Sequence, residues 1–99
     1  MKGKDRANLR AEAHHLTPEI HVGHQGITDA LVRAMDNALR VRELVKVDIS
    51  RNLTVTTREA ANALASATGA EVIQVIGRKA TLYRENPELE RKDGVPPWR

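Results

Sequence analysis

The amino-acid sequence predicts one α/β domain with a four-stranded mixed sheet and the element order α-β-α-β-α-β-β. Segments with helical spacing of apolar residues alternate with short runs rich in β-branched residues, and a hairpin turn ends the series. Glycine or threonine marks most of the junctions. The 99 residues suffice for a single core. We place this domain in residues 1–84 and expect residues 85–99, which contain three prolines, to form a polar tail.

The first part of the chain predicts two helices with a short strand between them. In residues 5–16, apolar residues recur at spacings of three and four. Residues 19–22 alternate polar and apolar side chains, as a half-buried strand does. Thr28 is a favourable N-cap, and the helical pattern that follows it runs to about Arg42. A short loop with two glycines therefore joins the first strand to the second helix.

The middle of the chain predicts a strand and a capped helix. Residues 44–49 alternate, with their apolar side chains on one side. Residues 51–55 are interpreted as a connector. Thr56 and Glu59 have the spacing of a capping box, in which each side chain bonds the other residue's backbone amide. Gly69 supplies the expected end of the helix.

Two further strands complete the predicted sheet. Residues 72–76 are almost continuously apolar, which is typical of an inner strand covered on both faces. A turn at Gly77 and Arg78 leads to a final antiparallel strand at residues 80–84. Helical crossovers between the earlier strands predict parallel pairing there, so the sheet is mixed.

The distribution of charge predicts a nucleic-acid partner. The chain has 16 Lys and Arg against 13 Asp and Glu, and its pI is near 9.7. Residues 33–58 hold six cations against three acids, whereas residues 85–99 are net negative. Arg78 and Lys79 occupy a hairpin turn that displays side chains outward, and no acid lies near them in the sequence. We expect these two residues to be accessible cations.

Several classes of function find no support in the sequence. It lacks cysteine, the common hydrolase and nucleotide-binding motifs, and any apolar run of about 18 residues that could span a membrane. Its four histidines are His14, His15, His21 and His24, and adjacent helical residues point about 100° apart, so no metal set is expected. We expect a cytoplasmic protein without catalytic activity, cofactor, metal or small-molecule substrate.

The loop of Gly23, His24, Gln25 and Gly26 is the strongest candidate site. Glycine allows a partner to approach the main chain closely, and the unpaired amides of a helix start favour an anion such as phosphate. A G-x-x-G loop between a strand and a capped helix resembles the loop by which KH domains bind a nucleic-acid backbone. With one Trp, one Tyr and no Phe, the chain offers few aromatic rings for stacking bases. It should therefore recognise backbone and shape.

Four stretches, taken in order, resemble the CRM domain, named for chloroplast RNA splicing and ribosome maturation. They are residues 9–16, residues 22–28, residues 68–78 and residues 82–84. As a single domain, the chain is similar to the stand-alone bacterial member of that family. The resemblance implies a fold like that of the C-terminal domain of a bacterial translation initiation factor. It also implies binding to ribosomal RNA in precursors of the large subunit, centred on the G-x-x-G loop.

Carried onto this sequence, the resemblance assigns RNA binding to the loop, and its neighbours are expected to assist. The expected RNA-binding residues are Gly23, His24, Gln25, Gly26, Thr28, Arg10, Arg33, Arg78 and Lys79. Family loops commonly hold a lysine where this chain has His24, so the loop lacks a fixed cation and relies on protonation of His24 or on cations nearby.

Two alternatives remain open at this point. The chain could instead be a protein-interaction module that docks on a ribosomal protein or an assembly factor, in which case its binding would be insensitive to salt. A small hydrolase or metal enzyme is the third reading, and it would require tightly bound metal. Ribosomal proteins are also expected as further partners of an RNA-binding domain in a ribosome precursor.

Overall fold

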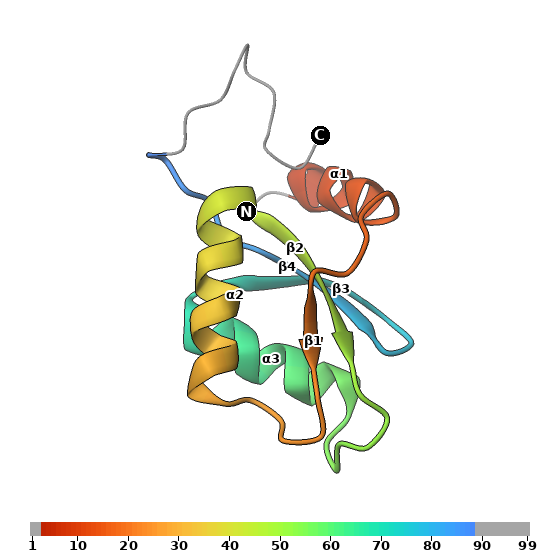
Figure 1. Ribbon diagram of the computed structural model, residues 1–99. Helices are drawn as coiled ribbons and strands as arrows, with labels where there is room; N and C mark the ends of the chain where they lie inside the picture. Colours follow the sequence, from red (N-terminus) through yellow and green to blue (C-terminus); the bar gives the residue numbers. More distant parts are fainter. Residues whose placement is uncertain (1–2, 89–99) are drawn as a thin grey trace.

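Helices and strands alternate in the predicted order in the computed structural model, which describes residues 3–88, with side chains from residue 5 (Figure 1). The elements are α1 (Gly3–Ala13), β1 (Ile20–Val22), α2 (Asp29–Arg42), β2 (Leu44–Ile49), α3 (Thr57–Thr68), β3 (Glu71–Ile76) and β4 (Lys79–Tyr83). The predicted α/β class and mixed sheet are confirmed. The first helix ends three residues earlier than expected, and a turn at His14 and His15 follows it.

The four strands lie in the order β1-β2-β4-β3. β1 pairs with β2 in parallel, whereas β4 is antiparallel to both β2 and β3. The prediction that residues 72–76 form an inner strand covered on both faces is wrong, because β3 lies at the edge and Ile76 is 56% exposed. The inner strands are β2 and β4, and Thr81 of β4 is buried. The sequence of β3 is apolar although the strand lies at the edge, because helices pack on parts of both of its faces.

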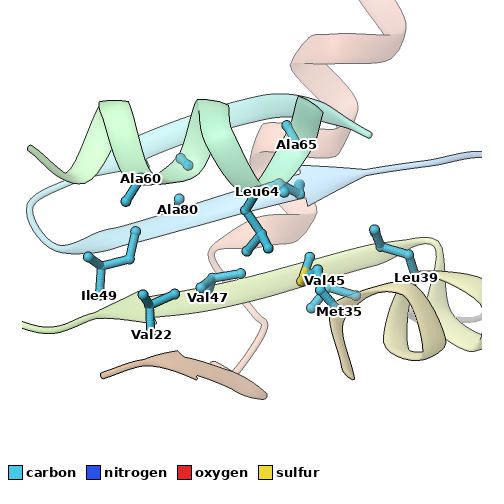
Figure 2. Packing of buried hydrophobic residues seen from close by; sticks show 12 residues of the cluster. Val22, Met35, Leu39, Val45, Val47, Ile49, Ala60, Leu64, Ala65 and Ala80 are labelled. Carbon is cyan, nitrogen blue, oxygen red and sulfur yellow. The ribbon is translucent and has the colours of Figure 1, made fainter. Parts of the chain in front are cut away.

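The main core lies between one face of the sheet and the helices α2 and α3. Alternate residues of β2 and β4 point into it and meet residues from both helices, as Figure 2 shows. Its buried residues are Val22, Met35, Leu39, Val45, Val47, Ile49, Ala60, Ala61, Leu64, Ala65, Ala80 and Leu82. The small alanines of α3 let this helix lie close to the sheet.

The helix α1 packs on the opposite face of the sheet. Leu9 contacts a second, smaller cluster that contains Leu44 and Ile73. Arg6 adds a hydrogen bond of 2.9 Å from Nη1 to the carbonyl of Val72, next to an ion pair with Glu71. Because α1 covers only part of this face, polar side chains such as Lys46, Gln74 and Lys79 remain at least partly exposed.

Local capping fixes the beginnings of α2 and α3 as predicted. Thr28 Oγ1 accepts a hydrogen bond of 3.1 Å from the amide of Leu31. Thr56 and Glu59 form both bonds of the capping box, at 3.0 and 3.3 Å. Gly69 ends α3 with φ 74°, a conformation that other residues rarely adopt.

The segment after β4 is fastened to the end of α2. Glu43, between α2 and β2, is fully buried with φ 63°, and its Oε2 accepts a hydrogen bond of 2.6 Å from the amide of Asn86. Asn86 Nδ2 donates to the carbonyl of Arg40 at 2.8 Å. The beginning of the predicted tail, residues 85–88, therefore contacts the domain, and residues 89–99 lie outside the described part of the chain.

Arg84 joins α2, α3 and the end of β4. Its Nη1 donates to Asp36 Oδ1 at 2.6 Å and to the carbonyl of Thr68 at 2.7 Å, and its Nη2 donates to the carbonyl of Asp36 at 3.0 Å. The hydrogen bond from Arg84 is the main cause of a lowered pKa of Asp36, with burial opposing it and the charges of Arg84 and Arg40 adding to it. The ionised carboxylate of Asp36 thus stabilises the fold.

The substitution Asp36→Asn should lower the free energy of unfolding at pH 7 by about 1 kcal/mol, since solvent partly screens the pair. Because the pKa is lower in the folded state, this stabilisation is present above the pKa of the unfolded chain and is lost as the pH falls. The difference between wild type and variant should therefore narrow below about pH 4 in urea titrations. A difference that stays constant down to about pH 2.5 would contradict this account.

Candidate nucleic-acid interface

Three connections meet at one end of the sheet. The parallel strands β1 and β2 finish there, and the β3–β4 turn lies beside them because β4 is antiparallel to β2 (Figure 1). Two backbone hydrogen bonds hold the connections together. The amide of Ser50 donates to the carbonyl of Val22 at 2.9 Å, and the amide of Ile49 donates to the carbonyl of Arg78 at 2.8 Å. We call this region, residues 23–28, 50–58 and 77–79, the loop end.

The G-x-x-G segment is a tight turn closed by its own hydrogen bond. The amide of Gly26 donates to the carbonyl of Gly23 at 3.0 Å, and Gly26 has φ 76°. The Gly26 amide thus serves the turn, which leaves fewer amides for a ligand than the sequence suggested. Within residues 3–88, no hydrogen bond uses the amides of Gly23, His24 or Gln25. Both His24 and Gln25 are exposed, so no side chain of the loop closes it off.

The start of α2 is already capped. The hydroxyl of Thr28 accepts the Leu31 amide, and the exposed Asp29 places a carboxylate in the first turn. A carboxylate at this position interacts favourably with the helix dipole and competes with a bound phosphate. The turn itself therefore offers more to an anion than the start of α2 does.

The loop end contains three arginines without an ion pair to another described residue. Arg51 follows β2, Arg58 lies in the first turn of α3, and Arg78 lies in the β3–β4 turn; all three are exposed. Among the ion pairs of the described residues, none involves these three side chains. A cation in the first turn of a helix opposes the dipole, so helix stability does not explain Arg58.

Of these three arginines, sequence reasoning identified only Arg78. The excess of cations in residues 33–58 was the available signal for the other two, but it could not separate them from paired residues. In the structure, Arg40 pairs with Asp36 at 2.8 Å and Arg42 pairs with Glu19 at 3.1 Å. The surplus that remains is concentrated at the loop end.

Lys79 is paired with an acid from another strand, although no acid lies near it in the sequence. The pairing of β2 with β4 places Asp48 directly across from Lys79, and Lys79 Nζ lies 3.2 Å from Asp48 Oδ1. His21 Nδ1 lies 3.2 Å from the other oxygen of Asp48. The hydrogen bond from Lys79 is the main cause of the lowered pKa of Asp48, and His21 contributes less. Lys79 therefore offers less charge to a ligand than Arg78 does.

The remaining two expected cations lie apart from each other. Arg33 is exposed on α2, about one helical turn beyond its start, and has no ion pair with another described residue. Arg10 is exposed on α1, which lies at the other end of the sheet from the loop of residues 23–26 (Figure 1). A ligand at the loop end would have to extend along the molecule to reach Arg10.

The described residues contain neither a metal-binding cluster nor a membrane-spanning helix. Residues 3–88 contain no group of three or more His, Cys, Asp or Glu side chains that could hold a metal ion. No helix in the same range is long and apolar enough to cross a membrane.

Comparisons with known proteins give a consistent family. The CRS1 / YhbY (CRM) domain matches residues 1–84. The chain is 36% identical over 88 residues to "Probable RNA-binding protein YqeI" of Bacillus subtilis, covering 89% of this chain and 92% of that protein. It is 34% identical over 90 residues to an "RNA-binding protein" of Haemophilus influenzae, with 91% of both covered. A solution structure of a Staphylococcus aureus protein proposed to bind RNA matches with TM-score 0.77 and 36% identity, covering 91% of this chain and 94% of that one.

The glycines of the loop should differ in their effect on stability. Gly26→Ala places a side chain at φ 76°, and Gly69→Ala does the same at φ 74° at the end of α3, so each should lower the free energy of unfolding by about 1 kcal/mol. Gly23 has no positive φ, and a Cβ there meets nothing within 4 Å, so Gly23→Ala should change stability by less than about 0.5 kcal/mol. Chemical denaturation measures all three. A large loss for Gly23→Ala would contradict this geometry.

Proposed function

Since the chain belongs to the CRS1 / YhbY (CRM) domain family, we propose that it is a non-catalytic RNA-binding protein that binds a sugar–phosphate backbone at the loop end. One observation supports this proposal most. Within the described residues, main-chain amides without a hydrogen-bond partner and arginines without an ion pair lie together at the loop end. The amides of Gly23, His24 and Gln25 provide directed donors, and the arginines provide charge.

Each residue has a distinct role in this proposal. The turn of residues 23–26 lets a phosphate approach the main chain, and Thr28 keeps the turn in place by capping α2. Arg51, Arg58 and Arg78 neutralise phosphates around the turn. They supply the fixed positive charge that the loop lacks because His24 stands where related loops commonly hold lysine. Arg33 and Lys79 contribute weaker contacts, and Arg10 contributes only if the RNA extends to α1.

The proposed RNA is ribosomal RNA in a precursor of the large subunit, and the proposed place of action is the cytoplasm. Support comes from the family and from relatives that are named as RNA-binding proteins. Crosslinking in cells, followed by sequencing of the attached RNA, tests this choice. Enrichment of messenger or transfer RNA over large-subunit precursors would contradict it. Salt-insensitive binding to a ribosomal protein, with no RNA attached, would instead favour a protein-docking module.

The arginines of the loop end should determine the salt dependence of binding. With large-subunit ribosomal RNA as the probe, Arg51→Gln, Arg58→Gln and Arg78→Gln should each weaken binding at low salt. Each should also reduce the slope of log affinity against log salt by about 1. Arg42→Gln is the matched control, because it removes the same charge from a side chain already paired with Glu19. Equal losses in all four variants would show a general charge effect and would contradict a localised site.

The position of the phosphate can be tested with two side chains of equal size. A side chain at Gly23 starts in open space, so both Gly23→Asp and Gly23→Asn should fold as the wild type does. If a phosphate lies at this turn, the carboxylate repels it and the amide does not, so Gly23→Asp should bind ribosomal RNA at least about tenfold more weakly than Gly23→Asn at low salt. Equal affinities in a filter-binding assay would remove the turn from the proposed site.

A further inference from the structure

A groove of about 450 Å³ lies directly beside the G-x-x-G turn. The turn forms one side, residues 52–55 form another, and the first turns of α3 form the third. The turn borders the groove directly, because His24, Gln25 and Gly26 line it, and a Cβ built on Gly26 would lie 3.7 Å from Leu53 Cδ2 of another wall. Its size falls within the range of about 300–1,000 Å³ that is typical of sites for small organic groups.

About half of the residues that line the groove have aliphatic side chains, and these are Ile27, Leu53, Val55, Ala60 and Ala63. Val55 is 45% exposed and is one of only three large hydrophobic side chains that are exposed in the described part of the chain. Apolar side chains gathered in an open hollow gain free energy when a flat apolar group covers them.

Polar groups without partners border these apolar walls. The side-chain amides of Gln25 and Asn52 make no hydrogen bond with any described residue, and each offers both donors and acceptors. The carboxylate of Glu59 also lies along the groove, where its Oε1 accepts the amide of Thr56. The negative charge of Glu59 repels phosphate from the groove. Arg51 and Arg58, which directly precede the groove residues Asn52 and Glu59 in the sequence, are positively charged. The charges therefore favour phosphate outside the groove and a neutral group inside it.

We propose that the groove binds the unstacked base of one nucleotide whose phosphate lies on the turn of residues 23–26, with Gln25 and Asn52 bonding the edge of that base. This inference rests on the proposed function and adds that the RNA must present an unpaired nucleotide at the site. Sequence-selective RNA recognition usually targets such nucleotides. The base is held between aliphatic side chains, which suits a protein with so few aromatic residues.

The test compares two RNA probes that carry the same phosphates. One is a ten-nucleotide single strand of adenosines or uridines, and the other is the same strand with abasic residues. The wild type should bind the strand with bases about tenfold more tightly than the abasic strand. The substitution Ala63→Leu fills the groove from an exposed position of α3, so it should abolish this preference and leave affinity for the abasic strand unchanged.

Ala67→Leu is the matched control, because Ala67 is another exposed alanine of α3, about one helical turn further along, and is not part of the groove wall. It should change neither affinity. Asn52→Ala should reduce any difference in affinity between adenosine and uridine strands.

Equal binding of both probes by the wild type would overturn the proposal that the groove binds a base. If Gly23→Asp then bound both probes more weakly, the proposed phosphate site would still be supported. No binding of either probe would overturn the groove proposal, whereas the phosphate site is judged separately by the binding of ribosomal RNA to Gly23→Asp and Gly23→Asn.

Discussion

The pairing of β2 with two different neighbours is the constraint on which the rest of the structure depends. Its parallel partner β1 must end where β2 ends, and its antiparallel partner β4 must begin there. The loop of residues 23–26, the connector after β2 and the β3–β4 turn are consequently brought together, although they are far apart in the sequence. Hydrogen bonds from Ile49 and Ser50 then fix their relative positions. The rigid sheet thus holds the neighbours of the candidate site in fixed positions around it.

Features that depend on a few neighbouring residues were predicted well from sequence. The caps at Thr28 and Thr56, the stop at Gly69 and the connector after β2 all depend on hydrogen bonds or backbone conformations within a few residues. The order of the strands depends instead on contacts between residues that are far apart in the sequence. An apolar run such as residues 72–76 indicates that helices cover the strand. The same run is found in a central strand and in an edge strand that is flanked by helices. The sequence therefore predicted an inner position for β3, which is an edge strand.

The same distinction explains which site residues sequence reasoning could identify. The glycines and Thr28 belong to a local pattern, and the structure places them together. The neutralisation of Lys79 depends on its register opposite Asp48, 31 residues away, which no local pattern contains. Arg51 and Arg58 stand out only once the partners of Arg40 and Arg42 are known. A regional excess of charge therefore finds the right part of the chain but not the right side chains.

Paired and unpaired arginines have different physical roles in this protein. Arg6, Arg40, Arg42 and Arg84 are paired with acids, and Arg84, with its side chain only 23% exposed, joins three elements of the fold. Because an acid lies beside each of them, these charges contribute little field outside the domain. The unpaired arginines of the loop end lie where main-chain amides of the described residues are also without partners. Because amides keep their dipoles at any pH and arginine keeps its charge, an anion site built from both needs no lysine in the loop. The phosphate site proposed for this G-x-x-G turn is therefore compatible with the histidine at position 24.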